Sequence, residues 1–220
     1  MRAFRPAACR PEGLHYVQGE AHEQVVDRRG GRGCRIRRRV VVARARQVSA
    51  NPGNVMPARL LVAGIGNIFQ GDDGFGVEVA RRLADGRLGG HVVVEDFGIR
   101  GVHLALELAS GAYDGAILVD AVSRGGEPGT LYAIEAHTEA VQQELQEDVP
   151  MDAHSLTPAA VLAWVRRLGG QRGRILIVGC EPASLDESIG LSDQVAAAVD
   201  GAVRMVCDLA VAMTGDPVCA

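Results

Sequence analysis

The sequence predicts an α/β protein in which helices cover a mostly parallel sheet. Short apolar runs alternate with segments of helical periodicity from residue 59 to near the C-terminus, which is typical of β-α units. Hydrophobic residues make up 47% of the 220 residues but aromatic residues only 4%, so we expect a core of Val, Ile, Leu and Ala. No apolar run reaches the length of a membrane span, so we expect no membrane contact.

Five segments predict strands. The first is a short apolar run that ends in glycines, which indicates a buried strand. The fourth alternates between apolar and polar residues and therefore predicts a more exposed or edge strand. In chain order, the five strands are expected over residues 59–66, 91–98, 115–122, 130–136 and 174–182.

Helical periodicity and capping residues predict four helices between and after these strands. Thr157 and Pro158 suit the N-cap and the first position of the third helix, and Ser192 can cap the last one. Glycines can end the first two helices. The four helices are expected over residues 74–86, 101–111, 158–168 and 191–213.

Residues 1–55 differ in composition from the rest of the chain. They hold twelve arginines and four acidic residues, a formal charge of +8, whereas the remainder carries −12 and the chain contains no Lys. A basic arm that binds nucleic acid is one interpretation. However, the segment has no convincing period, and Met56 stands directly before the first strand. We therefore expect residues 1–55 to be a disordered extension or not translated in the cell, residues 56–220 to form the domain, and no nucleic acid to bind.

The cysteines indicate the compartment. There are five, an odd number, and no CxxC pair occurs. This pattern does not indicate a disulfide framework, so the expected compartment is the reducing cytoplasm.

The glycine-rich stretch GIGNIFQGDDGFG, residues 64–76, connects the first strand to the first helix. Its first two glycines fit the GxGxxG turn of dinucleotide-binding proteins, but Phe69 occupies the third position. Asp72 and Asp73 would repel a pyrophosphate, and without Lys the chain cannot contain a P-loop. Dinucleotide binding is therefore disfavoured, although it is not excluded.

Polar side chains at the carboxyl ends of the predicted strands indicate a metal site instead. Asp72 and Asp73 follow the first strand, Asp120 ends the third, and His154 stands just before a helix. In a mostly parallel sheet these loops open on one edge, where such folds bind ligands. Two carboxylates and an imidazole suit a borderline divalent ion such as zinc or nickel, with coordination positions left open.

Each of these residues also has a purely structural interpretation. Asp73 can place negative charge at a helix N-terminus, Asp120 can accept hydrogen bonds from amides of its own loop, and His154 can be a solvated loop histidine. Asp96 and Glu181 also follow strands, so position alone does not select the ligands.

Five segments taken together resemble the hydrogenase maturation endopeptidases, which trim the C-terminus of nickel–iron hydrogenase large subunits. The segments are LLVAGIGNIFQGDDGFGVEVARRL, ILVDAV, PGTLYAIE, DAHSLTPAAVL and VGCEPASLDESIGLSDQV, in that order. The resemblance covers residues 59 to about 210 and leaves out residues 1–55. It implies a three-layer α/β/α sandwich around a mostly parallel, twisted sheet.

The resemblance also implies a mechanism. It assigns the metal-binding and catalytic positions of the family to Asp73, Asp120 and His154. These residues would bind nickel that the precursor already carries, and zinc could take its place in vitro. The metal would position the scissile bond and polarise its carbonyl or activate water. An aspartic-type endopeptidase activity, a hydrogenase large-subunit precursor as partner and a monomeric state are implied as well, whereas the nucleophile is not assigned.

The turn after the second strand departs from the family pattern. Many members carry G-T-x-G there, whereas this chain has Gly98, Ile99, Arg100 and Gly101. The resemblance implies that Gly98, Arg100 and Gly101 help to bind the substrate, and the altered turn leaves the identity of the hydrogenase open. Arg100 can also be a surface residue at the start of the second helix.

Two other functions stay open at this point. A non-catalytic nickel-sensing chaperone could use Asp73, Asp120 and His154 without cleaving a bond. A nucleotide-binding or small-molecule-binding module could use the glycine turn without a metal.

Deleting residues 1–55 is expected to leave folding and precursor processing intact, because the predicted domain begins at residue 56. Thermal unfolding of the truncated protein and the intact mass of a co-expressed precursor measure the two properties. An insoluble or inactive truncated protein would contradict this prediction.

Overall fold

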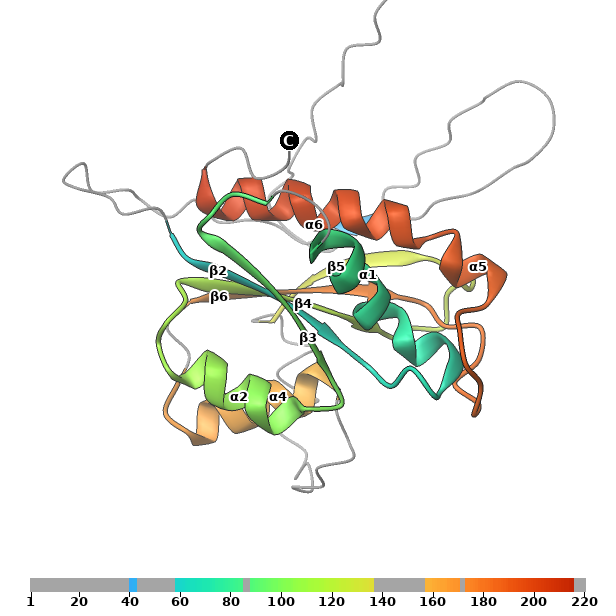
Figure 1. Ribbon diagram of the computed structural model, residues 1–220, viewed down its shortest axis with the longest axis horizontal. Coiled ribbons are helices and arrows are strands. Elements are labelled where there is room, and N and C mark those ends of the chain that lie inside the picture. The colour runs from blue at the N-terminus through green and yellow to red at the C-terminus, as the bar shows by residue number, and fades with distance from the viewer. Residues whose placement is uncertain (1–39, 43–57, 85–87, 137–156, 171–172, 216–220) are drawn as a thin grey trace, which may run out of the picture.

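The fold is built on one six-stranded sheet with the order β1-β5-β6-β4-β2-β3 (Figure 1). A computed structural model describes residues 40–42, 58–84, 88–136, 157–170 and 173–215. Only the β5–β6 pair is antiparallel, and the other neighbouring strands are parallel, which confirms the predicted mostly parallel sheet. The strands are β1 (Val40–Val42), β2 (Leu60–Ile65), β3 (Val92–Gly98), β4 (Gly115–Ala121), β5 (Leu131–Glu135) and β6 (Arg174–Cys180).

Helices cover both faces of this sheet and complete the three-layer sandwich that the sequence predicts (Figure 1). α1 (Phe75–Ala84) and α6 (Val199–Thr214) lie on one face, and α2 (Gly101–Ala109) and α4 (Pro158–Arg167) lie on the other. A short 3₁₀ helix, η1 (Gly71–Gly74), precedes α1, and α5 (Asp193–Ala196) precedes α6. Within the described residues, no helix is both long and apolar enough to cross a membrane.

Alternate residues of the central strands supply two separate cores, because successive side chains of a strand point to opposite faces. Val62, Ile117 and Leu176 are paired across β2, β4 and β6, and all three face α1 and α6. Leu61 and Leu118 belong to the other core, with the apolar residues of α2 and α4. The aliphatic core expected from the composition is thus confirmed.

Three local features differ from the sequence expectations. The predicted last helix is two helices, since α5 ends at Ala196 and α6 begins at Val199, although no glycine or proline marks the break. β1 lies within residues 1–55, where no element was expected; its three β-branched valines favour an extended chain, and they pair with β5. The expectation that the strand over residues 130–136 is more exposed or at an edge is therefore wrong, since β5 lies between β1 and β6 and is mostly buried. Cys207 is disulfide-bonded, whereas Cys180 is free and buried. The domain boundary at residue 56 stays a prediction.

Two glycines bring the glycine-rich stretch against the strand ends. A Cβ atom at Gly76, in the first turn of α1, would lie 2.1 Å from the Val119 carbonyl oxygen of β4 and 2.3 Å from that of Ile65 in β2. Gly66 has a φ of 128°, and a Cβ atom there would meet the Asp73 carbonyl oxygen at 1.8 Å. Only glycine permits this close approach, which places η1 and the start of α1 directly over the carboxyl ends of β2 and β4.

Gly76→Ala is expected to lower the free energy of unfolding by about 1–3 kcal/mol, the usual cost of forcing extra atoms into a packed interior. Denaturant unfolding measures the change. Gly90→Ala is the matched control, since a Cβ atom there meets nothing within 4 Å, and we expect a change within about 0.5 kcal/mol. Equal stabilities of the two variants would contradict the close packing of α1 on the sheet.

Candidate functional site

The candidate site lies where the chain connections of the sheet diverge. β2 and β4 are neighbouring parallel strands. After β2 the chain passes through α1 to β3 on one side, and after β4 it passes to β5 on the other side, beyond β6. Ligands of open α/β sheets bind at such a divergence, outside the carboxyl ends of the strands. η1 contacts β4 at this point, so the glycine-rich stretch covers the divergence.

Asp72, the first of the two adjacent aspartates, is a structural residue. It is only 1% exposed, and its Oδ1 accepts a hydrogen bond from the Ser192 amide at 2.6 Å. Its Oδ2 accepts three more, from the amides of Ala183 and Ser184 at 2.7 and 3.1 Å and from the Ser192 hydroxyl at 3.0 Å. Burial alone would raise the pKa of this carboxyl, but the four hydrogen bonds lower it overall. Asp72 is therefore held in its ionised form by contacts within the chain.

Asp73, the second aspartate, is left with spare coordinating capacity. It is half-buried, and its carboxylate accepts one hydrogen bond that is resolved among the described residues, from the Asn67 amide to Oδ2 at 2.6 Å. Desolvation raises the pKa of Asp73, and the bond from Asn67 opposes that rise without cancelling it. The carboxylate can thus bind a cation more favourably than Asp72 can.

Asp120 lies near the carboxyl end of β4, within electrostatic range of Asp73. It is 4% exposed, and its Oδ1 accepts a hydrogen bond from the Ala121 amide at 2.9 Å. Burial raises the pKa of Asp120 well above its ordinary range, and the negative charge of Asp73 raises it further, while the Ala121 bond lowers it. The two carboxyls are therefore close enough to repel each other when both are ionised.

This pair suits a shared cation or a shared proton. A divalent ion between the two carboxylates would replace their mutual repulsion with attraction and would compensate for their burial. His154, the third predicted ligand, lies outside the described residues. Among the residues that the structure describes, no group of three His, Cys, Asp or Glu side chains is arranged to hold a metal ion. The structure thus brings together two of the three predicted ligands.

The predicted substrate-binding residues form the turn between β3 and α2. Gly98 ends β3 with a φ of 50°, and its carbonyl oxygen accepts a hydrogen bond from the Gly66 amide at 3.1 Å, which ties this turn to the glycine-rich stretch. Gly101 is buried as the first residue of α2. Through Gly98, the turn that contains Arg100 and Gly101 is joined to the glycine-rich stretch, and its role in substrate binding stays a prediction.

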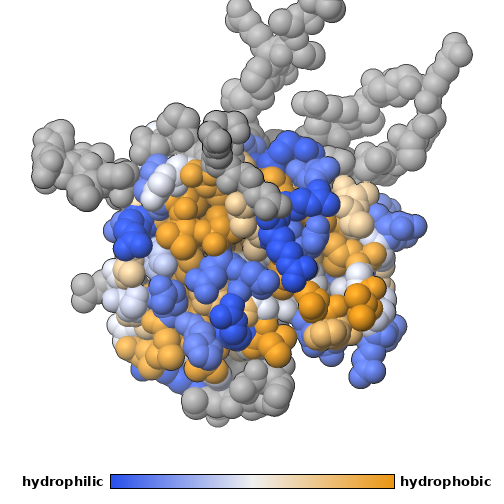
Figure 2. Space-filling model, viewed as in Figure 1, coloured by the Kyte–Doolittle hydropathy of each residue, from blue (hydrophilic) through white to orange (hydrophobic). Residues whose placement is uncertain are grey.

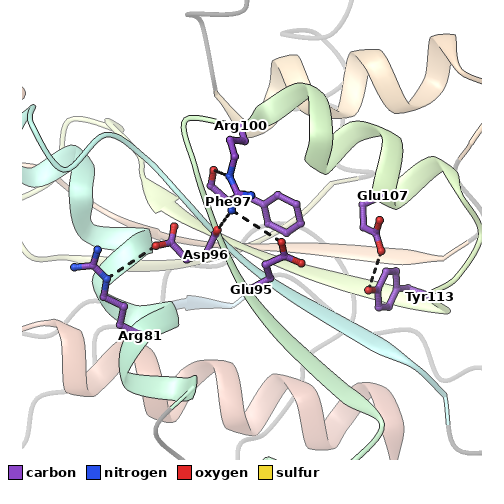
Figure 3. A network of polar contacts seen from close by, with 7 residues as sticks. All are labelled: Arg81, Glu95, Asp96, Phe97, Arg100, Glu107 and Tyr113. Atoms are coloured by element: carbon purple, nitrogen blue, oxygen red, sulfur yellow. Dashed lines mark hydrogen bonds and ion pairs between the residues drawn. The ribbon is translucent and has the colours of Figure 1, made fainter.

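Arg100 folds back over the end of β3 (Figure 3). Its side chain donates hydrogen bonds to the carbonyl oxygens of Asp96 and Phe97, and it lies 4.0 Å from the Glu95 carboxylate and over the Phe97 ring. The side chain is still 53% exposed. Arg100 is thus positioned at the border of the site by contacts within the chain, with part of its guanidinium open to solvent.

Other polar residues at this edge of the sheet have structural roles. Glu181 is 5% exposed and accepts hydrogen bonds from the Tyr132 hydroxyl at 2.6 Å and from the amides of Arg124 and Gly125. Burial opposes its ionisation, but these bonds lower its pKa overall. Burial, with the charges of Asp72 and Glu181, raises the pKa of the Cys180 thiol to about 12. Cys180 therefore cannot supply a thiolate nucleophile at neutral pH.

A cavity of about 340 Å³ lies at the opposite edge of the sheet. Its lining includes the starts of β4 and β6, the C-terminal ends of α2 and α4, and the ring of Tyr113, but no carboxyl or imidazole group. The cavity therefore offers no acid–base chemistry, and it lies away from Asp73 and Asp120.

Sequence reasoning selected Asp73 and Asp120 as site residues, which stays a prediction, and it missed the structural role of Asp72. The donors to Asp72 lie 111 to 120 residues further along the chain. No local pattern predicts such contacts. The available signal was the P-x-S…G-L-S segment, which contains Ser184 and Ser192. This segment is specific for the family only in combination with the glycine-rich stretch, which links the two parts of the sequence.

Comparisons with known proteins point to one family. A family model described as hydrogenase maturation protease matches residues 77–209. The chain is 32% identical over 152 residues to a putative hydrogenase maturation protease of Methanocaldococcus jannaschii, covering 67% of this chain and 93% of that protein. It is 31% identical over 156 residues to the hydrogenase 2 maturation protease of Escherichia coli, and the match covers 67% of this chain and 88% of that protein. The solved structure of the hydrogenase maturating endopeptidase HybD from Escherichia coli is similar, with 29% sequence identity and a TM-score of 0.61. The match covers 73% of this chain and 96% of that one.

Asp72→Asn and Asp120→Asn are expected to change stability in opposite directions at neutral pH. In Asp72→Asn, the new side-chain amide group would face backbone donors, which should lower the free energy of unfolding by about 1–3 kcal/mol. Asp120→Asn removes a buried carboxyl that is costly to ionise, so it should raise the free energy of unfolding, by about 1.4 kcal/mol for each unit of the raised pKa. Denaturant unfolding without metal measures both.

The pH dependence distinguishes the two effects. The folded-state pKa of Asp72 is lowered. Its contribution to the free energy of unfolding is therefore present above the unfolded-state pKa of about 3.9 and is lost as the pH falls through the folded-state pKa. The folded-state pKa of Asp120 is raised. Its contribution to the free energy of unfolding is therefore present below the unfolded-state pKa of about 3.9 and is lost as the pH rises through the folded-state pKa. A gain from Asp120→Asn that is as large at acidic as at neutral pH would contradict this assignment.

Proposed function

This chain belongs to the hydrogenase maturation protease family and is a hydrogenase maturation endopeptidase, and we propose that it recognises its substrate through nickel. The substrate in this proposal is a nickel–iron hydrogenase large-subunit precursor that already carries the metal. The peptidase removes the C-terminal extension of that precursor. Asp73, Asp120 and His154 bind the nickel, which is part of the substrate and not a resident cofactor. The protein acts as a monomer in the cytoplasm.

The proposal is supported by the position of Asp73 and Asp120 near the carboxyl ends of the neighbouring strands β2 and β4, within electrostatic range of each other. Both carboxyls have a raised pKa because they are desolvated, and the charge of Asp73 raises that of Asp120 further. A site of this kind gains binding energy from a divalent cation, because the ion compensates the negative charges of a half-buried and a buried carboxyl at once. A precursor without nickel offers no such compensation, so the same two residues can distinguish loaded from empty precursor.

The proposed chemistry divides the work between substrate and enzyme. Asp73 and Asp120 orient the nickel, and the nickel polarises the carbonyl of the scissile bond or activates a water molecule. Attack by water is favoured, since Cys180 is protonated at neutral pH. Water adds to the carbonyl carbon, the peptide C–N bond breaks, and the leaving amine takes up a proton.

The turn of Gly98, Arg100 and Gly101 is the proposed determinant of which precursor is accepted. Gly98 is hydrogen-bonded to the loop of Asp73, and Arg100 presents an exposed cationic group beside it. A guanidinium in this place suits a substrate segment with a carboxylate or with backbone carbonyl oxygens at its surface.

Co-expression of the protein with its cognate large-subunit precursor tests the proposal. The intact mass of the precursor is expected to fall by one C-terminal peptide when nickel is supplied, and not in nickel-depleted medium. Asp73→Asn is expected to slow cleavage at least about 100-fold, because it removes one of two charges that hold the ion. Asp96→Asn is the matched control, since Asp96 is an acidic residue near the carboxyl end of β3 but is 40% exposed beside Arg81.

Three outcomes would count against parts of the proposal. Cleavage that is equally fast without nickel would remove nickel recognition and leave the endopeptidase activity. Equal loss of activity in Asp73→Asn and Asp96→Asn would remove the assignment of Asp73. An uncleaved precursor that forms a nickel-dependent complex would favour a chaperone.

A further inference from the structure

Three large apolar side chains are exposed together beside the candidate site. Phe69 is 62% exposed, Leu185 47% and Ile189 84%. They come from two loops far apart in the sequence, the one before α1 and the one before α5. Figure 2 shows apolar surface at the right of the molecule, where Figure 1 places these loops. Single exposed apolar residues are common, but a cluster of large ones indicates an interaction surface. We call Phe69, Leu185 and Ile189 the apolar corner.

The two loops that form the apolar corner are fastened to each other. The Gly71 amide donates to the Ser188 carbonyl oxygen at 2.9 Å, and the Ser188 amide donates to the Phe69 carbonyl oxygen at 3.1 Å. Asp72, next along the chain, holds the second loop with its four hydrogen bonds. The apolar side chains therefore stand on an ordered backbone, so a partner that buries them need not order these loops first.

The apolar corner is continuous with the site. The Phe69 amide donates to the Asn67 side-chain oxygen at 3.0 Å, and the Asn67 amide donates to the Asp73 carboxylate. A protein that covers Phe69 is therefore adjacent to Asp73. The corner itself protrudes, since Ile189 is the most exposed of the large apolar residues described. Protruding side chains suit pockets on a folded partner better than they suit an extended peptide, which needs a groove.

The border of the apolar corner is acidic. Asp186, Glu187 and Asp193 are exposed around it, and residues 183–195 contain no arginine. An apolar centre with a charged border is the usual anatomy of a protein–protein interface. Charge complementarity therefore predicts that the matching surface of the partner is apolar with basic residues around it.

We propose that the apolar corner docks the folded body of the hydrogenase large-subunit precursor, through an apolar pocket bordered by basic side chains. The proposal rests on the proposed function, which makes that precursor the substrate. Docking at the corner brings the precursor next to Asp73 and Asp120 without using either residue. The corner thus supplies affinity for the protein, and the two aspartates supply recognition of the metal.

Steady-state cleavage of purified nickel-loaded precursor by Phe69→Ser and Ile189→Ser tests the inference. Each variant is expected to raise KM roughly ten-fold, as loss of an interface anchor does, and to leave kcat within about two-fold of the wild-type value. Leu168→Ser is the matched control, because Leu168 is 52% exposed at the end of α4, near the opposite edge of the sheet. Its KM is expected to stay unchanged. Thermal unfolding checks that all three variants are folded.

The other outcomes overturn the inference in distinguishable ways. If wild-type protein cleaves the precursor and the corner variants keep the wild-type KM, the docking surface is wrong and the proposed function stands. If wild-type protein does not cleave the precursor, the proposed function fails and the inference fails with it. If the variants lose affinity for the isolated C-terminal extension peptide, the corner binds that peptide and not the folded body. If Ile189→Ser converts a dimer to a monomer in sedimentation, the corner is a self-interface.

Discussion

The buried carboxylate of Asp72 is the interaction on which the rest of the site depends. It joins the glycine-rich stretch to the loop before α5 through four hydrogen bonds, at the cost of burying a charge. Glu181 performs a similar task on the other side of β6, where it holds the loop around Arg124 and the hydroxyl of Tyr132. A buried carboxylate is tolerated only when its lone pairs are satisfied. In both cases backbone amides of a neighbouring loop satisfy them, so the burial of charge also fixes the loop.

The number of hydrogen bonds that each carboxyl accepts separates Asp72 and Glu181 from Asp73 and Asp120. Asp72 and Glu181 have lowered pKa values because several donors hold them in the ionised form. Asp73 and Asp120 each accept one resolved hydrogen bond and have raised pKa values. Sites with such unfavourable carboxyls are commonly sites of binding or catalysis, where stability is given up for chemistry. The two carboxyls with raised pKa values, Asp73 and Asp120, thus lie near the divergence of β2 and β4, between two loops that other carboxylates hold in place.

Sequence reasoning recovered what depends on local pattern. Apolar runs located the strands of the domain, and Thr157 with Pro158 marked the start of α4, because strand burial and helix capping are determined over a few residues. It missed the break between α5 and α6, since Val195 and Val199 are both buried in the core without any glycine or proline to interrupt the pattern. It also missed the hydrogen bonds that the Asp72 carboxylate accepts and the apolar corner, because each forms only when loops more than 100 residues apart in the sequence meet. The residues Asp73 and Asp120 became distinguishable from Asp96 and Glu181 through the family resemblance. In the structure, Glu181 differs from them because several hydrogen bonds satisfy it, and Asp96 differs because its side chain is 40% exposed beside Arg81.

The long reach of Asp72 has a consequence for the order in which the protein becomes competent during synthesis. The carboxylate is made early, but every donor that holds it belongs to residues 183–192. A nascent chain still emerging from the ribosome therefore has the glycine-rich stretch without its anchor. The glycine-rich stretch can gain this anchor only after residues 183–192 have been synthesised.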